Sequence, residues 1–159
     1  MPTASEGSPA PAPPGPLYCD ASALAKLFFP ETGSDELNDL LAARNDVMLS
    51  DLAITEVVSA LSRRMREGSL PAAAARRAHR KILSTAAGGA LRRVELLAAT
   101  HREAERLLLT SGDSALRAAD ALHLALALGA GAGTVLTYDR GMARAAHAHG
   151  LAVWPEASL

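Results

Sequence analysis

Residues 17–30 decide the fold of this chain, and they read LYCDASALAKLFFP. Residues 17–20 open with an apolar run, which predicts a short buried strand. Residues 23–29 predict a helix, for which Ser22 is the expected N-cap and which Pro30 stops. A strand that leads directly into a helix is the unit from which parallel sheets are built, so this segment favours an α/β fold.

The same alternation of short strands and helices continues along the chain. Further strands are expected at residues 47–49, around Val94, at 134–137 and at 151–154. Helices are expected at residues 34–44, 51–67, 71–87, 98–109, 116–128 and 139–149, with Ser50 or Asp51 and Ser114 among their caps. This pattern predicts a parallel sheet covered by helices on both faces, and sites in such sheets form beyond the carboxyl ends of the strands.

Length and composition indicate one globular domain behind a tail. The chain has 159 residues, of which 49% are hydrophobic but only 3% aromatic, so its core has to be built from Ala, Leu and Val. Residues 1–16 are rich in Pro, Ala, Gly and Ser and carry one charge, Glu6. Because prolines disrupt helices and strands, we expect a flexible tail at residues 1–16 and a folded domain at residues 17–159.

The basic residues are unevenly distributed. A net charge of −1 gives the chain as a whole no general affinity for nucleic acid. Seven of the 16 basic residues nevertheless fall on two predicted helices that form a hairpin: Arg63, Arg64, Arg66, Arg76, Arg77, Arg80 and Lys81. The sequence leaves two interpretations of this cluster open, a solvated helix face or a surface that contacts phosphate groups or a partner.

Several classes of protein are excluded. Cys19 is the one cysteine, so the chain has no intrachain disulfide and no Cys-rich zinc site, and the thiol is expected to pack in the core. An uncharged apolar run of about 18 residues is missing, so no membrane span is expected. The first residues lack the charged and apolar regions of a secretory signal. We therefore expect a cytoplasmic protein without a membrane partner.

Four acids lie within otherwise apolar segments, namely Asp20, Glu56, Asp120 and Asp139. A carboxylate at the rim of a core costs free energy unless pairing, hydrogen bonds or a cation compensate it. Four such costs in one small domain indicate a shared compensator, and a divalent metal is the natural one. Ordinary alternatives remain for each acid: Asp20 and Asp139 would also suit helix N-caps, and Glu56 and Asp120 could point to solvent.

His123 and Asp51 lie close in sequence to this set of acids. His123 follows Asp120 by three residues, so the two side chains can share one face of a helix. We favour a histidine that is hydrogen-bonded within the fold over a metal ligand, because a hard, oxygen-seeking ion does not need imidazole. Asp51 stays open as a candidate, because it starts the helix that carries Glu56.

Four segments resemble motifs of one known family, the PIN-domain proteins. Residues 18–27, YCDASALAKL, resemble the opening motif of the family, and residues 51–57, DLAITEV, match the segment that carries its glutamate. Residues 116–125, LRAADALHLA, are similar to the third-acid motif of the VapC toxins, and residues 136–139, LTYD, resemble the fourth. Order and spacing agree over about residues 17–155.

The resemblance implies a fold and an activity. The fold would be a PIN-like three-layer α/β/α sandwich with a short, mainly parallel sheet. The activity would be that of an endoribonuclease dependent on Mg²⁺ or Mn²⁺, acting as the toxin of a VapBC toxin–antitoxin pair. Expected partners are an RNA substrate, a VapB-like antitoxin and a second copy of the chain in a homodimer. The family's metal-binding acids carry over to Asp20, Glu56, Asp120 and Asp139, and its neighbouring polar residues to Ser22 and Thr137.

Three rival functions are weaker. A phosphate-accepting signalling domain needs an acidic pair near its first strand and a late lysine, but Asp20 has no acidic neighbour and no lysine follows Lys81. A DNA-directed nuclease of related fold would be longer and would carry extra acids. A non-catalytic PIN-like module that binds RNA or protein is the main alternative, although such a module would not need four intact acids.

Overall fold

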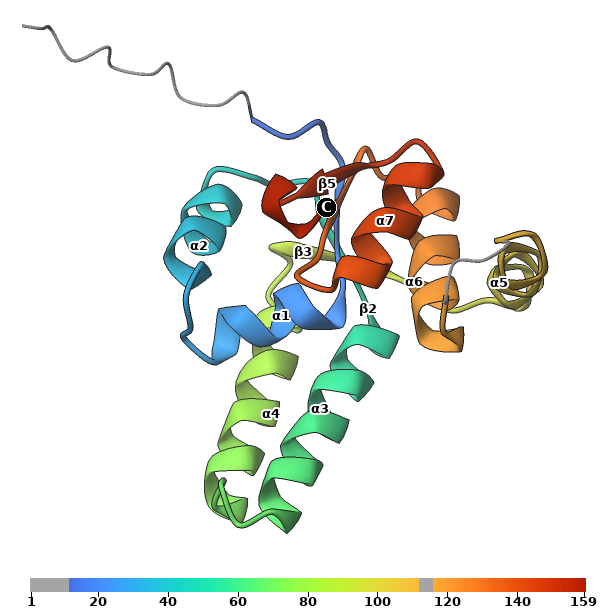
Figure 1. Ribbon diagram of the computed structural model, residues 1–159. Helices are drawn as coiled ribbons and strands as arrows, with labels where there is room; N and C mark the ends of the chain where they lie inside the picture. The colour runs from blue at the N-terminus through green and yellow to red at the C-terminus, as the bar shows by residue number, and fades with distance from the viewer. Residues whose placement is uncertain (1–11, 112–115) are drawn as a thin grey trace, which may run out of the picture.

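A five-stranded parallel sheet forms the centre of the computed structural model, which describes residues 12–111 and 116–159. Its strands are β1 (Leu17–Cys19), β2 (Val47–Ser50), β3 (Leu91–Val94), β4 (Thr134–Leu136) and β5 (Ala152–Trp154). They lie in the order β3-β2-β1-β4-β5, and each neighbouring pair is parallel (Figure 1). The predicted α/β fold with a mainly parallel sheet is therefore confirmed.

Helices cover both faces of the sheet. They are α1 (Ala21–Phe28), α2 (Ser34–Ala42), α3 (Asp51–Arg66), α4 (Ala72–Ala87), α5 (Ala98–Thr110), α6 (Ala118–Gly129) and α7 (Arg140–Ala148), followed by a 3₁₀ helix at Glu156–Ser158. Successive strand residues point to opposite faces, so Leu17 and Cys19 pack with α1 to α4, whereas Tyr18 packs with α5 to α7. The result is the expected three-layer sandwich.

The core consists of small and aliphatic side chains, as the composition predicted. Leu24, Leu49 and Leu136 fill one side of the sheet, and Leu124 and Val135 fill the other. The thiol of Cys19 is buried among the first group, which confirms its expected place. Among the described residues, no helix has both the length and the apolar composition that crossing a membrane requires.

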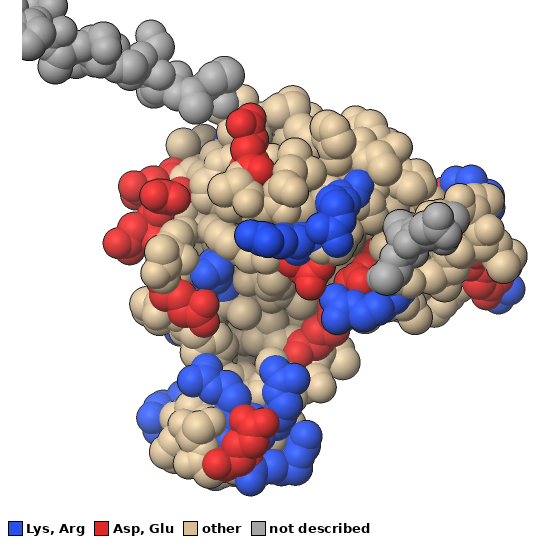
Figure 2. All heavy atoms as spheres, viewed as in Figure 1, with Lys and Arg blue, Asp and Glu red and all other residues tan. Residues whose placement is uncertain are grey.

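Helices α3 and α4 form the predicted hairpin, which projects from the body of the domain (Figure 1). Ser50 caps α3, because its hydroxyl oxygen accepts a hydrogen bond from the Ala53 amide. Gly68 lies beyond the end of α3 with a φ of 73°, a conformation that favours glycine and lets the chain reverse. Basic side chains gather around the outer end of this hairpin (Figure 2).

Two helix starts differ from the prediction. Helix α1 begins at Ala21, and Asp20 rather than Ser22 caps it, because the Asp20 carboxylate lies 3.0 Å from the Ala23 amide. Helix α6 begins at Ala118, with Arg117 in the N-cap position. The predicted cap Ser114 lies outside the described residues.

The described part of the predicted tail lies against the domain. The Pro16 carbonyl accepts a hydrogen bond from the Gly133 amide, and the Pro14 carbonyl accepts one from the Thr134 hydroxyl. The Arg44 guanidinium also donates to a carbonyl of this segment. Residues 12–16 therefore extend the packed region beyond the expected boundary. The prediction for residues 1–11 falls outside the described residues, and the division of the chain stays a prediction.

Candidate active site

Asp20 lies at the carboxyl end of β1, the central strand of the sheet, and its side chain is buried. Its Oδ1 atom accepts hydrogen bonds from the Ser22 hydroxyl at 2.7 Å and from the Ala23 amide at 3.0 Å. Burial raises the pKa of this carboxyl above its usual value, and hydrogen bonds from Thr137 and Ser22 offset part of the rise. The carboxylate is thus fixed in place, at a cost that a nearby cation would relieve.

Asp139 approaches the same edge of the sheet from β4. Because β1 and β4 are adjacent and parallel, the residues that follow them emerge side by side. Asp139 caps α7, since its Oδ1 atom accepts from the Met142 amide at 2.9 Å. The Asp139 amide donates to the Thr137 hydroxyl at 3.0 Å, and that hydroxyl lies 3.4 Å from the Ser22 hydroxyl. Ser22 and Thr137 therefore tie the two strand ends together.

Glu56 reaches the site from α3 and is held by a histidine of α6. The Oε2 atom of Glu56 lies 2.5 Å from Nε2 of His123, whose Nδ1 atom lies 2.8 Å from the Tyr18 hydroxyl. The Tyr18 hydroxyl in turn lies 3.0 Å from the Ser50 hydroxyl. His123 is hydrogen-bonded within the fold, as we expected, but it also positions Glu56, which the sequence did not predict.

Asp120 reaches the site from the first turn of α6 and is paired with Arg117. The Nε atom of Arg117 donates to Asp120 Oδ2 at 2.9 Å, and its Nη2 atom donates to Asp139 Oδ2 at 3.1 Å. Sequence reasoning missed Arg117. The spacing was the available signal, because residues three apart on a helix are neighbours and an Arg–Asp pair at this spacing forms readily.

All four predicted acids converge on one small cavity of about 100 Å³. It is lined by Asp20, Ala21, Ser22, Glu56, Arg117, Asp120, His123 and Asp139. In the space-filling view, acidic and basic side chains meet between the α3–α4 hairpin and the rest of the domain (Figure 2). Asp51 does not line this cavity and instead forms an ion pair with Arg93.

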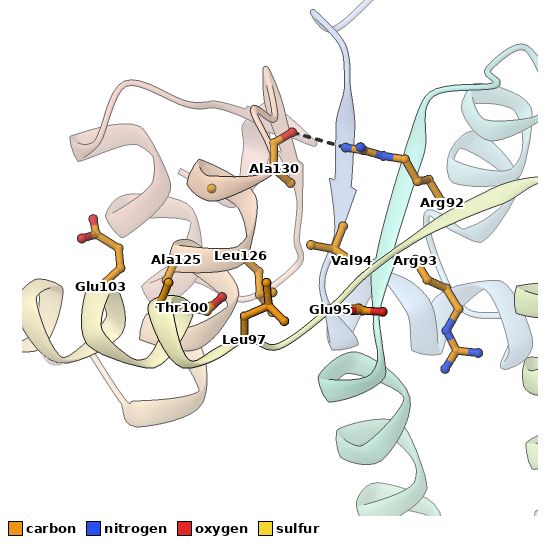
Figure 3. A pocket seen from close by; sticks show the side chains of 12 residues that line it. Arg92, Arg93, Val94, Glu95, Leu97, Thr100, Glu103, Ala125, Leu126 and Ala130 are labelled. Atoms are coloured by element: carbon orange, nitrogen blue, oxygen red, sulfur yellow. Dashed lines mark hydrogen bonds between the residues drawn. The ribbon is translucent and has the colours of Figure 1, made fainter.

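A larger cavity of about 400 Å³ lies between the edge strand β3 and helices α5 and α6 (Figure 3). None of the four acids lines it. Its polar side chains include Arg92, which donates to the Ala130 carbonyl, and Glu95 (Figure 3). Convergent titratable groups are the better indicator of chemistry, so we take the smaller acidic cavity as the candidate active site.

The acidic cavity has the ligands for a hard divalent cation, because carboxylate oxygens are what Mg²⁺ and Mn²⁺ prefer. In the present arrangement, however, the described residues contain no group of three or more His, Cys, Asp or Glu placed to hold a metal ion. Arg117 forms ion pairs with Asp120 and Asp139, and His123 is hydrogen-bonded to Glu56. The residues fit a metal in kind, and binding to Asp120 and Asp139 would require the Arg117 guanidinium to be displaced.

Comparisons with known proteins identify the family of the chain. The family model described as the PIN domain matches residues 17–148. Ribonuclease VapC45 of Mycobacterium tuberculosis is 38% identical over 141 residues, which cover 87% of this chain and 94% of that protein. Ribonuclease VapC46 of the same species is 36% identical over 142 residues, which cover 86% and 95%.

Solved structures show the same fold. VapC20 of Mycobacterium tuberculosis, described as a toxin that cleaves the sarcin-ricin loop, matches with a TM-score of 0.67 and 18% identity, covering 82% of this chain and 95% of that one. VapBC2 of Rickettsia felis, bound to a promoter DNA fragment, matches with a TM-score of 0.57 and 13% identity, covering 86% and 96%. By the family match and the identity to two VapC ribonucleases, the chain belongs to the PIN-domain family, among the relatives of VapC.

Proposed function

We propose that this protein is an endoribonuclease that depends on Mg²⁺ or Mn²⁺ and serves as the toxin of a type II toxin–antitoxin system. The observation that carries the proposal is the convergence of four carboxylates, from two strand ends and two helices, on one cavity. Its relatives VapC45 and VapC46 are named ribonucleases, which supports the same activity here.

The four acids of the cavity, Asp20, Glu56, Asp120 and Asp139, would hold the ion. When bound, such an ion would offset their charge, stabilise negative charge on a phosphate group and supply an activated water for hydrolysis. The chain contributes preorganisation, because a ligand that is already fixed needs no reorganisation during the reaction.

Three features of the chain supply that preorganisation. Asp20 and Asp139 are fixed as helix caps, and His123 fixes Glu56. The hydroxyls of Ser22 and Thr137 lie between the two strand ends and are suited to hold a water or a phosphate oxygen.

The proposal extends to the substrate class and the partners. We propose single-stranded or looped RNA as substrate, because its bases are exposed and readable. Arginines near the cavity would guide the RNA backbone. A VapB-like antitoxin is the proposed partner, in line with the VapBC2 assembly that shares this fold. A homodimer is the proposed assembly state.

Incubating the full chain with RNA tests the proposal. We expect cleavage with Mg²⁺ or Mn²⁺, none after EDTA treatment, and recovery when the metal is added back; mapping the RNA ends then identifies the target. Cleavage that persists in EDTA would show a different mechanism. RNA binding without cleavage under any metal condition would favour the alternative, a non-catalytic PIN-like binding module.

A further inference from the structure

Arg117 bridges two of the four acids in the cavity. Its guanidinium contacts Asp120 through Nε at 2.9 Å and Nη2 at 3.3 Å, and contacts Asp139 through Nη2 at 3.1 Å. The two carboxylates come from α6 and from the end of β4, so they lie 19 residues apart in sequence (139 − 120) and share this one cation. The contacts thus occupy both oxygens of Asp120 and one oxygen of Asp139.

The guanidinium compensates a repulsion that the fold creates. Two carboxylates that face one cavity repel each other, and an opposite charge between them favours their charged forms. Arginine suits this place because its planar fork donates in several directions at once. A divalent cation would relieve the same repulsion by binding the same two carboxylates, so arginine and metal compete for them.

The Arg117 side chain can also move away from the two carboxylates into solvent. Its side chain is 70% exposed, whereas that of Asp120 is 12% exposed. The Arg117 amide donates to Asp120 Oδ2 independently of the guanidinium, so the start of α6 stays capped when the side chain turns into solvent. The acid is therefore fixed in the cavity while its cationic partner is exchangeable.

We propose that Arg117 is an internal counter-ion, which holds Asp120 and Asp139 before the metal binds and competes with the divalent cation for their oxygens. The inference rests on the proposed function, since it requires a cation at these acids. Arg117 thus has a positioning role in the metal-free chain. Its competition with the cation sets the metal concentration at which the site fills.

Calorimetric titration of the metal-free full chain with Mn²⁺ tests this role without relying on activity. We expect Arg117→Gln to bind Mn²⁺ on the order of tenfold more tightly than the wild type, since the guanidinium no longer competes for the two carboxylates. Arg117→Lys keeps the charge but loses the fork, so its affinity should lie in between. Arg140→Gln is the matched control, because Arg140 is exposed next to Asp139 and forms no ion pair with a described residue.

Thermal melting gives a second readout of the same competition. In EDTA, Arg117→Gln should melt below the wild type, because Asp120 and Asp139 are left to repel each other. In saturating Mn²⁺ this difference should vanish. Arg140→Gln should follow the wild type in both conditions.

The outcomes separate this inference from the proposed function. If the wild type and Arg117→Gln bind Mn²⁺ equally, or if the variant binds more weakly, the competition is overturned while the metal centre stands. If neither the wild type nor any variant binds Mn²⁺ or Mg²⁺, the metal centre itself is overturned, and the role of Arg117 with it.

Discussion

Helix α3 carries two charged regions of opposite character. Glu56 lies on its inner half and lines the acidic cavity, while Arg63, Arg64 and Arg66 lie in its last turn. Basic side chains gather at the outer end of the hairpin that α3 forms with α4 (Figure 2). Each acid of the cavity has a hydrogen-bond partner, from Arg117, His123 or a helix amide. None of the seven basic residues of the hairpin forms an ion pair with a described residue.

The difference shows what burial demands of a charge. An enclosed carboxylate loses its water and has to be compensated by specific groups, which ties it to its neighbours. An exposed arginine keeps its water, so its position and its partners are loosely determined and its single contribution is small. Single replacements should therefore have large effects in the cavity, whereas several replacements together are needed on the hairpin.

Replacing Asp20 should have the largest effect on activity. We expect Asp20→Asn to lower the rate of RNA cleavage on the order of 10³-fold, because the variant keeps a cap for α1 but removes a charge that holds the cation. Glu67→Gln, an exposed acid at the end of the hairpin helix, is the control and should cleave at the wild-type rate. Full activity in Asp20→Asn, measured with the same RNA and metal, would contradict the assignment of the site.

Replacing His123 should have the next largest effect, here on stability. His123→Ala should lower the free energy of unfolding by about 1–3 kcal/mol, because the Tyr18 hydroxyl loses a buried partner and Glu56 loses its support. Arg77→Ala on the hairpin should change it by less than about 0.5 kcal/mol. Urea unfolding measures the free energy of unfolding of both variants. Similar losses in the two variants would show that the cavity is no more constrained than the surface.

The hairpin should act through its summed charge. We expect the triple variant Arg63→Ala, Arg64→Ala and Arg66→Ala to weaken antitoxin binding or self-association about tenfold at low salt, with little effect at high salt, where charges are screened. Titration with the antitoxin and light scattering measure the two outcomes. Unchanged antitoxin affinity together with an unchanged assembly state would leave the cluster as a solvated helix face.

The smallest effect should be a difference in response to pH. Because burial raises the folded-state pKa of Asp20, this carboxyl stabilises the metal-free fold at low pH, and that contribution is lost as pH rises through the folded pKa. Asp20→Asn should therefore gain stability relative to the wild type as pH rises from about 4, near the usual pKa of an aspartate, towards neutral. The hairpin arginines stay charged over this range, so the triple variant should show the wild-type pH dependence. Urea unfolding in EDTA at several pH values measures the free energy of unfolding of each variant. If this free energy changed with pH in the same way in Asp20→Asn and in the wild type, the prediction would be contradicted.

Much of the architecture was predictable from local pattern. Apolar runs such as Val47 to Leu49 mark strands, and Pro30 and Gly68 mark helix ends, because these signals depend on neighbouring residues alone. The four acids were also predictable as a group, since each interrupts an apolar segment. Local pattern was insufficient at α1, where Asp20 and Ser22 both suit the cap and only the path of the chain after β1 selects Asp20.

The sequence by itself determined the alternation of strands and helices, the composition of the core and the four acids that converge on the cavity. The tertiary structure alone decided which distant side chains the acids and their partners contact. Tyr18 and His123 are 105 residues apart in sequence, and they meet because α6 packs on the face of the sheet to which Tyr18 points. Arg117 joins Asp120 to Asp139 for a similar reason, since the start of α6 lies beside the end of β4. Contacts of this kind depend on how layers pack, which no local pattern specifies.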